Sequence, residues 1–210
     1  MSATSVIDPA AIDAIVEGLE RSGFLEVSSL VPPPLAASLR EHARELLAAS
    51  GFQPARVGFK RLERRAEIRG DSIRWVDNAT THPALRAYLD FVEELRVALN
   101  RRLMLGAWEY EGHFAVFPPG KGYQCHVDAS PHSPRRLVTL VLYLNEGWRE
   151  EDGGALVVWT GDGNRRATCW PEQGRLVAFL SAEIPHEVQP SQRERWSLTG
   201  WLCQRGGAVA

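Results

Sequence analysis

The feature that most constrains this fold is a series of short apolar runs in the second half of the chain. The runs are rich in Val, Leu, Trp, Phe and Tyr, and turn-forming stretches such as PPGKG, GDGN and PEQG separate them. They cover residues 113–117, 123–128, 136–144, 154–159, 175–180, 185–189 and 194–202. Strands of this length, without helices between them, indicate an antiparallel sandwich or barrel.

The first half of the chain has a helical period instead, with helices predicted at about 9–21, 33–49 and 83–103. Prolines begin the second helix, where a missing N–H costs nothing because it would have no partner. In the third, apolar residues recur every three or four positions and form one stripe, which we expect to pack against a sheet. The predicted fold is α+β and mainly β: a double-stranded β-helix (jelly roll) supported on one side by N-terminal helices.

The chain has 210 residues, of which 44% are hydrophobic, and this fits one domain better than two. Residues 1–105 would give mostly helical support, and residues 106–203 the jelly-roll core. Within the first of these parts, a basic segment at about 52–74 is either a solvated loop that pairs its own charges or a mobile lid or substrate loop over a site.

Several classes of partner and compartment are disfavoured. A net charge of −2 gives no general attraction to nucleic acid. The longest apolar run, 137–144, is far shorter than the ~20 residues of a membrane helix. Acidic Asp8 and Asp13 lie where a secretory signal would be basic and then apolar. Three cysteines without CxxC spacing fit reduced thiols, so we expect a cytoplasmic protein.

Three residues form a candidate metal site. His126 and Asp128 are separated by one residue in a predicted strand, so both side chains lie on the same face. This HxD pattern is weak by itself, but a jelly roll can bring His186, in EIPHEVQP, beside it. Two imidazoles and one carboxylate leave three positions of an octahedral ion open, as in non-heme Fe(II) oxygenases. Zinc would more often be tetrahedral.

A candidate anion anchor lies in RERWSLTGW, where Arg195 and Thr199 share one face of the last strand. A guanidinium is always charged and can bind a carboxylate through two parallel hydrogen bonds. The alternative is a surface arginine paired with Glu194 or Glu187. The combination with the HxD pattern and His186 favours an anchor for a dicarboxylate cosubstrate.

The other histidines are expected to be structural or exposed. His42 lies in a predicted helix, His82 at a helix start, His113 on an edge strand and His132 in a turn. None of them has a partner at the spacing of a metal site.

Five stretches of the chain form a recognisable pattern: FPPGKGYQCHVD, LVTLVLYLNEGW, DGGAL, PHEVQP and RERWSLTGW. On these motifs, the chain from about residue 69 to 202 resembles the prolyl 4-hydroxylase family of Fe(II)- and 2-oxoglutarate-dependent oxygenases. The resemblance extends to bacterial members and to the animal hydroxylases of hypoxia-inducible factor. It implies that His126, Asp128 and His186 bind Fe(II), with 2-oxoglutarate and O₂ as cosubstrates and ascorbate as reductant. It also implies hydroxylation at C4 of a prolyl residue in a protein or peptide, with release of succinate and CO₂.

The resemblance also assigns roles around the metal. Tyr143 would donate its hydroxyl to the carboxylate held by Arg195, with Thr199 lining that pocket. One departure concerns this pocket: Phe117 occupies a position where several relatives have tyrosine, and the turn after it is one residue shorter. This removes a possible hydroxyl contact.

The same resemblance implies five substrate contacts. Tyr123 would lie near the iron and the substrate proline, and Trp201 would form the pocket floor. Trp75, Arg69 and Asp71 would shape the loop and the pocket mouth. The alternative for these residues is an aromatic core and a loop salt bridge.

Three other functions remain open from the sequence. The same chemistry could act on a small molecule such as a free amino acid. A metal- or oxygen-sensing jelly roll without turnover would not need a dicarboxylate clamp of Arg195 and Tyr143. A zinc hydrolase would need a general base at fixed spacing to the ligands, and none is evident.

Overall fold

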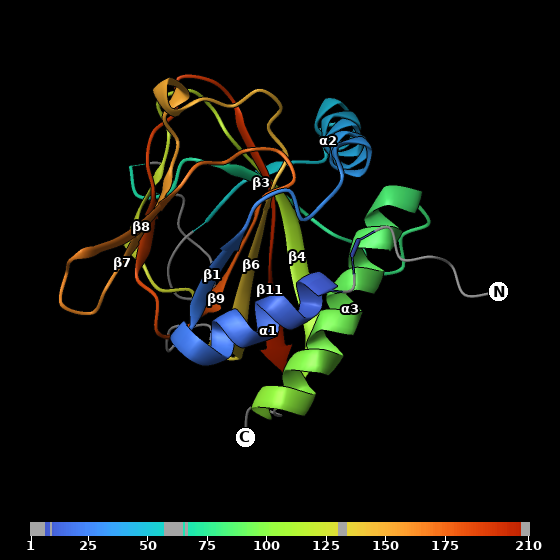
Figure 1. Cartoon of the computed structure of the whole chain (residues 1–210). Helices are drawn as coiled ribbons and strands as arrows, with labels where there is room; N and C mark the ends of the chain where they lie inside the picture. The colour runs from blue at the N-terminus through green and yellow to red at the C-terminus, as the bar shows by residue number, and fades with distance from the viewer. Residues whose placement is uncertain (1–6, 9, 57–64, 66, 130–133, 207–210) are drawn as a thin grey trace.

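The computed structural model describes residues 7–8, 10–56, 65, 67–129 and 134–206. In this part of the chain, three α-helices form the N-terminal half: α1 (Ala10–Ser22), α2 (Pro33–Ala48) and α3 (Pro83–Leu103). Figure 1 shows α1 and α3 in front of one sheet, with α2 beyond its end. The three predicted helices are confirmed to within one residue at each end.

The strands form two antiparallel sheets, which confirms the predicted jelly roll. The larger sheet has the order β1-β9-β6-β11-β4-β3-β2, and the smaller sheet β5-β10-β7-β8. The bounds are β1 (Phe24–Val27), β2 (Gln53–Pro54), β3 (Ser72–Trp75), β4 (Ala107–Phe117), β5 (Tyr123–His126), β6 (Arg136–Tyr143), β7 (Leu156–Trp159), β8 (Arg165–Cys169), β9 (Leu176–Leu180), β10 (His186–Val188) and β11 (Arg195–Gln204).

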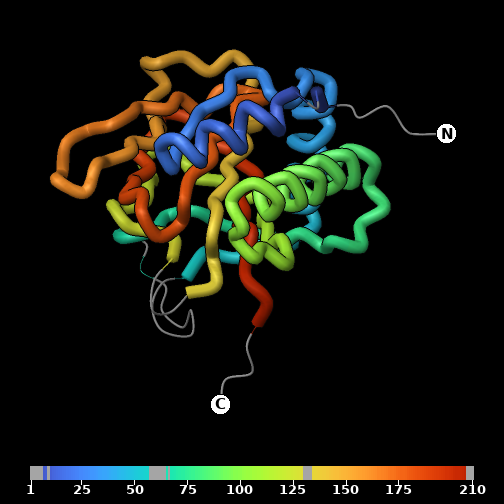
Figure 2. Tube along the Cα trace, turned by 60° about the horizontal axis from the view of Figure 1, so that its bottom comes forward, coloured from blue at the N-terminus to red at the C-terminus, as the bar shows by residue number. Residues whose placement is uncertain are grey.

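The helices cover one face of the larger sheet, and in Figure 2 α1 and α3 run side by side across it. The apolar stripe of α3 packs into the core between helices and sheet, where Leu95 and Leu99 are fully buried and Leu103 is partly buried. A second apolar cluster, which includes Val177 and Phe179, fills part of the space between the two sheets. The larger sheet is therefore covered on both faces.

The central strands of the larger sheet alternate between these two layers. In β11, Trp196, Leu198 and Leu202 belong to the helix-side core. Their neighbours face the smaller sheet, because successive side chains of a strand point to opposite faces. The register places Thr199 between His113 of β4 and Val141 of β6. A row of side chains thus lines the inner face of the sheet.

The structure differs from the sequence prediction in four strands that were not expected: β1, β2, β3 and β8. All four strands are only two to five residues long, and β1, β3 and β8 contain charged residues. They are stabilised by neighbouring strands, which the local sequence pattern does not reveal. Strand β4 also begins at Ala107, earlier than predicted. Strand β5 ends at His126, so Asp128 follows the strand instead of lying within it.

Part of the predicted loop at 52–74 lies outside the described residues, namely 57–64 and 66. The described residues at the end of this loop run beside β5, where Gln124 N–H donates to Ile68 O and Gly70 N–H donates to Gly122 O. The predicted turn residue His132 also lies outside the described residues. None of the helices described is long and apolar enough to cross a bilayer.

Candidate metal centre and cosubstrate pocket

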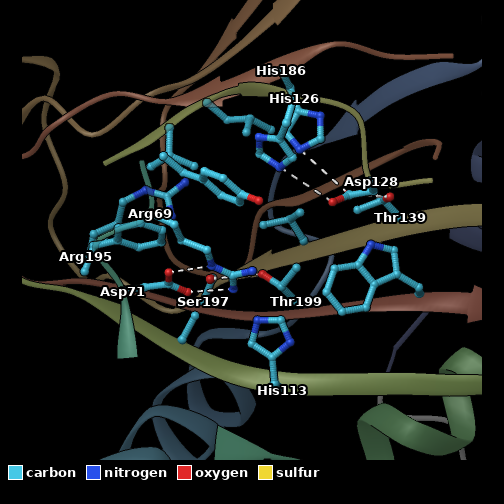
Figure 3. A pocket seen from close by; sticks show the side chains of 17 residues that line it. Arg69, Asp71, His113, His126, Asp128, Thr139, His186, Arg195, Ser197 and Thr199 are labelled. Carbon is cyan, nitrogen blue, oxygen red and sulfur yellow. Dashed lines mark hydrogen bonds and ion pairs between the residues drawn. The ribbon is translucent and has the colours of Figure 1, made fainter. Parts of the chain in front are cut away.

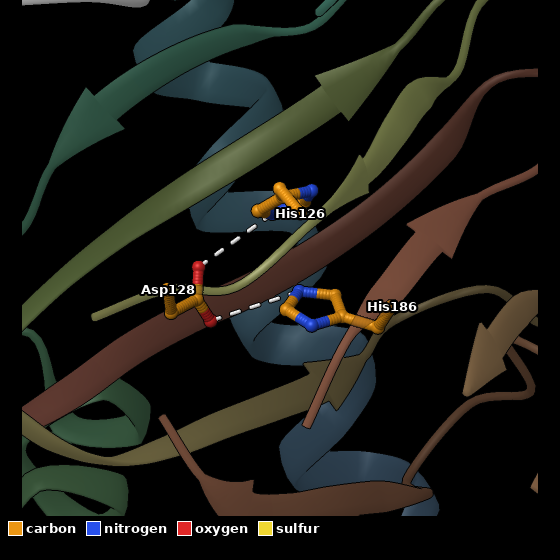
Figure 4. A group of neighbouring side chains, drawn as sticks. All are labelled: His126, Asp128 and His186. Atoms are coloured by element: carbon orange, nitrogen blue, oxygen red, sulfur yellow. Dashed lines mark ion pairs between the residues drawn. The ribbon is translucent and has the colours of Figure 1, made fainter. Parts of the chain in front are cut away.

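Three potential metal ligands converge where β5 and β10 pair (Figure 4). His126 ends β5, His186 begins β10, and the two residues are direct cross-strand partners. Asp128 follows β5 and reaches both rings: Nε2 of His126 lies 3.6 Å from Asp128 Oδ1, and Nε2 of His186 lies 3.7 Å from Oδ2. One ligand atom from each residue lies within 4.8 Å of the others. This geometry suits a single ion.

The backbone fixes which imidazole nitrogen is available. Nδ1 of His126 lies 2.7 Å from Gln124 O, and Nδ1 of His186 lies 3.0 Å from Ile184 O. A carbonyl oxygen can only accept, so each neutral ring carries its proton on Nδ1 and donates it there. The lone pair on each Nε2 is left free to bind a metal.

Protonation states also favour metal binding. Burial lowers the pKa of His186, which keeps its imidazole neutral. For Asp128, burial alone would raise the pKa, but interactions with His186, His126 and Arg136 hold it well below its usual range. Neutral imidazoles and an ionised carboxylate are the forms that bind a divalent cation.

A cavity of about 480 Å³, including its open mouth, adjoins the three ligands. Figure 3 shows the two histidines on one side of it and His113 on the opposite side. Most of the predicted site residues line this cavity: His126, Asp128, His186, Arg195, Thr199, Tyr123, Arg69, Asp71 and Trp201. The fold therefore gathers these residues from β5, β10 and β11, from the position just after β5, and from the loop before β3.

Arg195 is buried beside two aromatic rings. Its Nε donates to Gly154 O at 2.8 Å, and its guanidinium carbon lies 4.9 Å from the Tyr143 ring centroid and 5.5 Å from that of Phe117. Arg195 Nη2 and the Tyr143 hydroxyl are buried and have no hydrogen-bond partner among the described residues. Glu194 does not pair with Arg195 and accepts a hydrogen bond from Trp196 Nε1.

These two unpartnered groups are both donors. Burial lowers the pKa of Arg195, but a guanidinium stays charged. Burial raises the pKa of Tyr143, so its phenol keeps its proton. A buried donor without a partner is costly, and a carboxylate between these two groups would satisfy both.

The lining of the cavity contains a bidentate ion pair. Nε and Nη2 of Arg69 donate to the two carboxylate oxygens of Asp71 at 2.7 and 2.9 Å. Burial alone would lower the pKa of Arg69, but Asp71 raises it above its usual value. The Tyr123 ring stacks on the His126 imidazole with centroids 3.6 Å apart, close to the proposed metal position.

Two predicted site residues do not line the cavity. Tyr143 is completely buried, and its ring lies against the guanidinium of Arg195, which does line the cavity. Trp75 is 40% exposed, and its ring contacts those of His113 and Trp201 with centroids 5.1 and 6.4 Å away. Trp75 thus lies next to two residues that line the cavity.

The expectation for His113 was wrong. Strand β4 lies between β11 and β3, and His113 is buried and lines the cavity. Thr139 and Ser197 also line it and were not predicted. The two-residue alternation could have indicated them, since Thr139 shares a strand face with Tyr143, and Ser197 lies between Arg195 and Thr199.

The two remaining described histidines lie outside the cavity lining. The rings of His42 and His82 stack with centroids 3.9 Å apart. His82 Nδ1 also accepts a hydrogen bond from Leu85 N–H at the start of α3. Both contacts are structural, as expected.

Comparison with known proteins identifies the family. A prolyl-4-hydroxylase from Pseudomonas putida, known by crystal structure, is 40% identical and has a TM-score of 0.83. The match covers 93% of this chain and all of that one. The chain belongs to the prolyl 4-hydroxylase family of 2OG-Fe(II) oxygenases. The model of the 2OG-Fe(II) oxygenase superfamily also matches residues 112–203.

Animal members of the prolyl 4-hydroxylase family are more distant. Human prolyl hydroxylase EGLN3 is 27% identical over 93% of this chain and 84% of its own. Human Egl nine homolog 1 is 27% identical over 91% of this chain but only 46% of its own, so the chain spans about half of that relative. A Trichoplax adhaerens prolyl hydroxylase, solved with a peptide of hypoxia inducible factor, shares the fold at 24% identity with a TM-score of 0.85.

The site fits the cofactors of the 2OG-Fe(II) oxygenases, which are Fe(II) and 2-oxoglutarate. Two imidazole nitrogens and one carboxylate form a suitable iron set. The unpartnered donors of Arg195 and Tyr143 suit the distal carboxylate of 2-oxoglutarate. This observation on the buried polar atoms is independent of the sequence comparisons.

Proposed function

We propose that this chain is a 2-oxoglutarate-dependent dioxygenase that hydroxylates C4 of a prolyl residue in a protein or peptide. Each turnover would consume one O₂ and one 2-oxoglutarate. One oxygen atom enters the new hydroxyl group, the other enters succinate, and CO₂ is released. The observation that carries the proposal is the His126, Asp128 and His186 cluster in one cavity with Arg195, beside the buried hydroxyl of Tyr143.

The metal and cosubstrate roles follow from the donors present. His126, Asp128 and His186 would hold Fe(II), which supplies an oxidant strong enough to break an unactivated C–H bond. Arg195 and Tyr143 would bind the distal carboxylate of 2-oxoglutarate, and Thr199 lines the same side of the cavity. Burial of this clamp excludes water, which strengthens each of its hydrogen bonds.

The substrate roles rest on position around the cavity. Tyr123 stacks on His126 and would contact the prolyl ring, while Trp201 would bound the inner end. The ion pair of Arg69 and Asp71 would shape the mouth, and Trp75 would extend this aromatic surface outward. The names of the Pseudomonas and human relatives support proline as the target.

We further propose a reducing, cytoplasmic setting and ascorbate as the reductant that keeps the metal ferrous. Cys125, Cys169 and Cys203 are all free thiols in the structure, which supports such a compartment. Dependence of long-term turnover on ascorbate would test the second part.

The decisive experiment incubates purified protein with Fe(II), 2-oxoglutarate and O₂, together with a proteome digest, an intact protein extract or free L-proline. Succinate is measured, and products are scored for an added oxygen atom by mass spectrometry. We expect hydroxyproline in a small number of protein sequences, with one succinate for each hydroxyl group formed. Asp128→Ala serves as the control without metal.

The outcomes separate the remaining alternatives. Turnover with free amino acids alone would replace the proposed substrate class with a small molecule. Succinate formation absent under all conditions, despite bound metal and 2-oxoglutarate, would overturn the enzyme assignment and favour a sensing role.

A further inference from the structure

A chain of two buried hydroxyl groups ends on the carboxylate of the metal site. Thr139 Oγ1 donates to Asp128 Oδ2 at 2.8 Å, and Thr139 Oγ1 lies 2.9 Å from Ser181 Oγ. Thr139 and Ser181 are fully buried, and Asp128 is 9% exposed. Figure 3 shows Thr139 directly beside Asp128, on the side away from Arg195.

The direction of these bonds follows from counting protons. A hydroxyl has one proton to donate, and an ionised carboxylate can only accept. Because Thr139 gives its proton to Asp128, Ser181 must be the donor in the second bond. The two hydrogen bonds therefore run in one direction, from Ser181 to Thr139 and from Thr139 to Asp128. Hydrogen bonds aligned in this way strengthen one another.

Ser181 also holds the backbone next to Asp128. The N–H of Ala129 donates to Ser181 O at 2.9 Å, and the N–H of Ser181 donates to Leu137 O at 2.9 Å. Ser181 follows β9, and Leu137 lies in β6. Both the side chain and the main chain of the Asp128 segment are thus tied to the larger sheet.

The two histidine ligands belong to the smaller sheet instead, at the end of β5 and the start of β10. Asp128 itself lies in no strand, and residues 130–133 that follow are not described. Contacts with Thr139 and Ser181 therefore fix a carboxylate that its own backbone does not hold in a sheet. They also link the position of the carboxylate to that of the larger sheet.

We propose that Thr139 and Ser181 are positioning residues that orient Asp128 toward the metal. The inference rests on the proposed metal site and deepens it. Thr139 fixes the plane of the carboxylate, and Ser181 fixes the hydroxyl of Thr139. Removing a group that holds a metal ligand in this way typically weakens metal binding by about 10- to 100-fold. We therefore expect a loss of at least about tenfold here.

The test uses Mn(II), which does not turn over, and measures its dissociation constant by the electron paramagnetic resonance signal of free Mn(II). Thr139→Val keeps the shape but removes the donor, and should raise the dissociation constant at least about tenfold. Thr139→Ser restores the hydroxyl and should stay within about twofold of wild type. Ser181→Ala should produce a smaller rise than Thr139→Val.

Thr168→Val is the matched control, because Thr168 lies in β8 and does not line the cavity. It should leave Mn(II) affinity unchanged. The absorption spectrum of bound Co(II) adds a second readout, since a change in carboxylate orientation alters the visible bands, whereas a general loss of stability does not. Thermal unfolding without metal shows whether each variant is folded.

Two failures are distinguishable. Wild-type protein that does not bind Mn(II), or binds it as well after Asp128→Ala, would refute the metal site and this inference together. A wild-type site that binds Mn(II), with folded Thr139→Val equal to it in affinity and Co(II) spectrum, would refute only the positioning role.

Discussion

The environment of the Arg195 side chain indicates which kind of ligand the cavity binds. The residue is 1% exposed, and its Nη2 has no hydrogen-bond partner among the described residues. Burying a charged donor in this way is expensive unless a ligand completes its bonds. The Tyr143 hydroxyl beside it has the same need. The pair is therefore better explained as a binding site than as part of the core.

The first prediction concerns this clamp. Arg195→Lys keeps the positive charge but loses the planar arrangement of donors, and should raise the KM for 2-oxoglutarate by about 10- to 100-fold. Tyr143→Phe removes one hydrogen bond to a charged group and should raise it about tenfold. Initial rates at varied 2-oxoglutarate concentration measure both effects.

The matched readout for both variants is Mn(II) affinity, which should remain within about twofold of wild type because neither side chain is among the ligands. Asp128→Ala should weaken the binding of both metal and cosubstrate. Equal loss of metal affinity in Arg195→Lys and Asp128→Ala would contradict the separate roles.

At the scale of elements, the metal site depends on the close approach of β5 to β10. Gly122 precedes β5, and a Cβ atom at this position would lie 2.3 Å from Val188 O, which is too close for any side chain. Val188 is in β10, and its cross-strand partner is Tyr123. Glycine is needed here because the two backbones leave no space between them.

We therefore predict that Gly122→Ala separates β5 from β10 and moves His126 away from His186. Mn(II) affinity should fall by about tenfold or more, together with a loss of about 1–3 kcal/mol in the free energy of unfolding. Denaturant titration and Mn(II) binding measure the two effects. Gly161→Ala is the control, because a Cβ at Gly161 would meet nothing within 4 Å; similar losses in both variants would contradict the explanation.

At the scale of the whole molecule, the site lies between the two sheets. The histidines come from the smaller sheet, whereas Arg195 and Thr139 come from the larger one. A metal and a cosubstrate bound together would therefore connect the sheets. Ligands that bind only the folded state stabilise it by mass action.

We predict that Mn(II) and 2-oxoglutarate, at about 100 times their dissociation constants, add about 2.7 kcal/mol of stability for each site filled. For a chain of 210 residues, this corresponds to a rise in Tm of about 5–10 °C for each ligand. Differential scanning calorimetry measures the shift. Asp128→Ala should abolish the metal part, and an unchanged rise in that variant would place the metal elsewhere.

We also propose that the helices and the two sheets form one domain, because both apolar clusters pack against the same larger sheet. Unfolding without ligands should then follow a single transition by both circular dichroism and tryptophan fluorescence. Leu95→Ala in α3, a fully buried position, should shift both signals equally and cost about 2–5 kcal/mol. Two separate transitions would contradict a single domain.

The sequence by itself determined which side chains each strand presents on the same face. Alternation with a period of two decides which side chains share a face, so the grouping of Arg195 with Thr199 could be predicted without a structure. The leucine spacing of 83–103 determined a helix and its buried stripe in the same way. The HxD spacing put His126 near Asp128, although the strand in the structure ends at His126, before the aspartate that the prediction had included.

Only the tertiary structure decided which strands became neighbours. The pairing of β5 with β10 brings His126 beside His186, and the pairing of β4 with β11 brings His113 into the cavity. The hydroxyl chain from Ser181 to Asp128 was also invisible in the sequence. Local patterns fix the face of a residue, but contacts between distant segments depend on the packing of the whole chain, which no local spacing encodes.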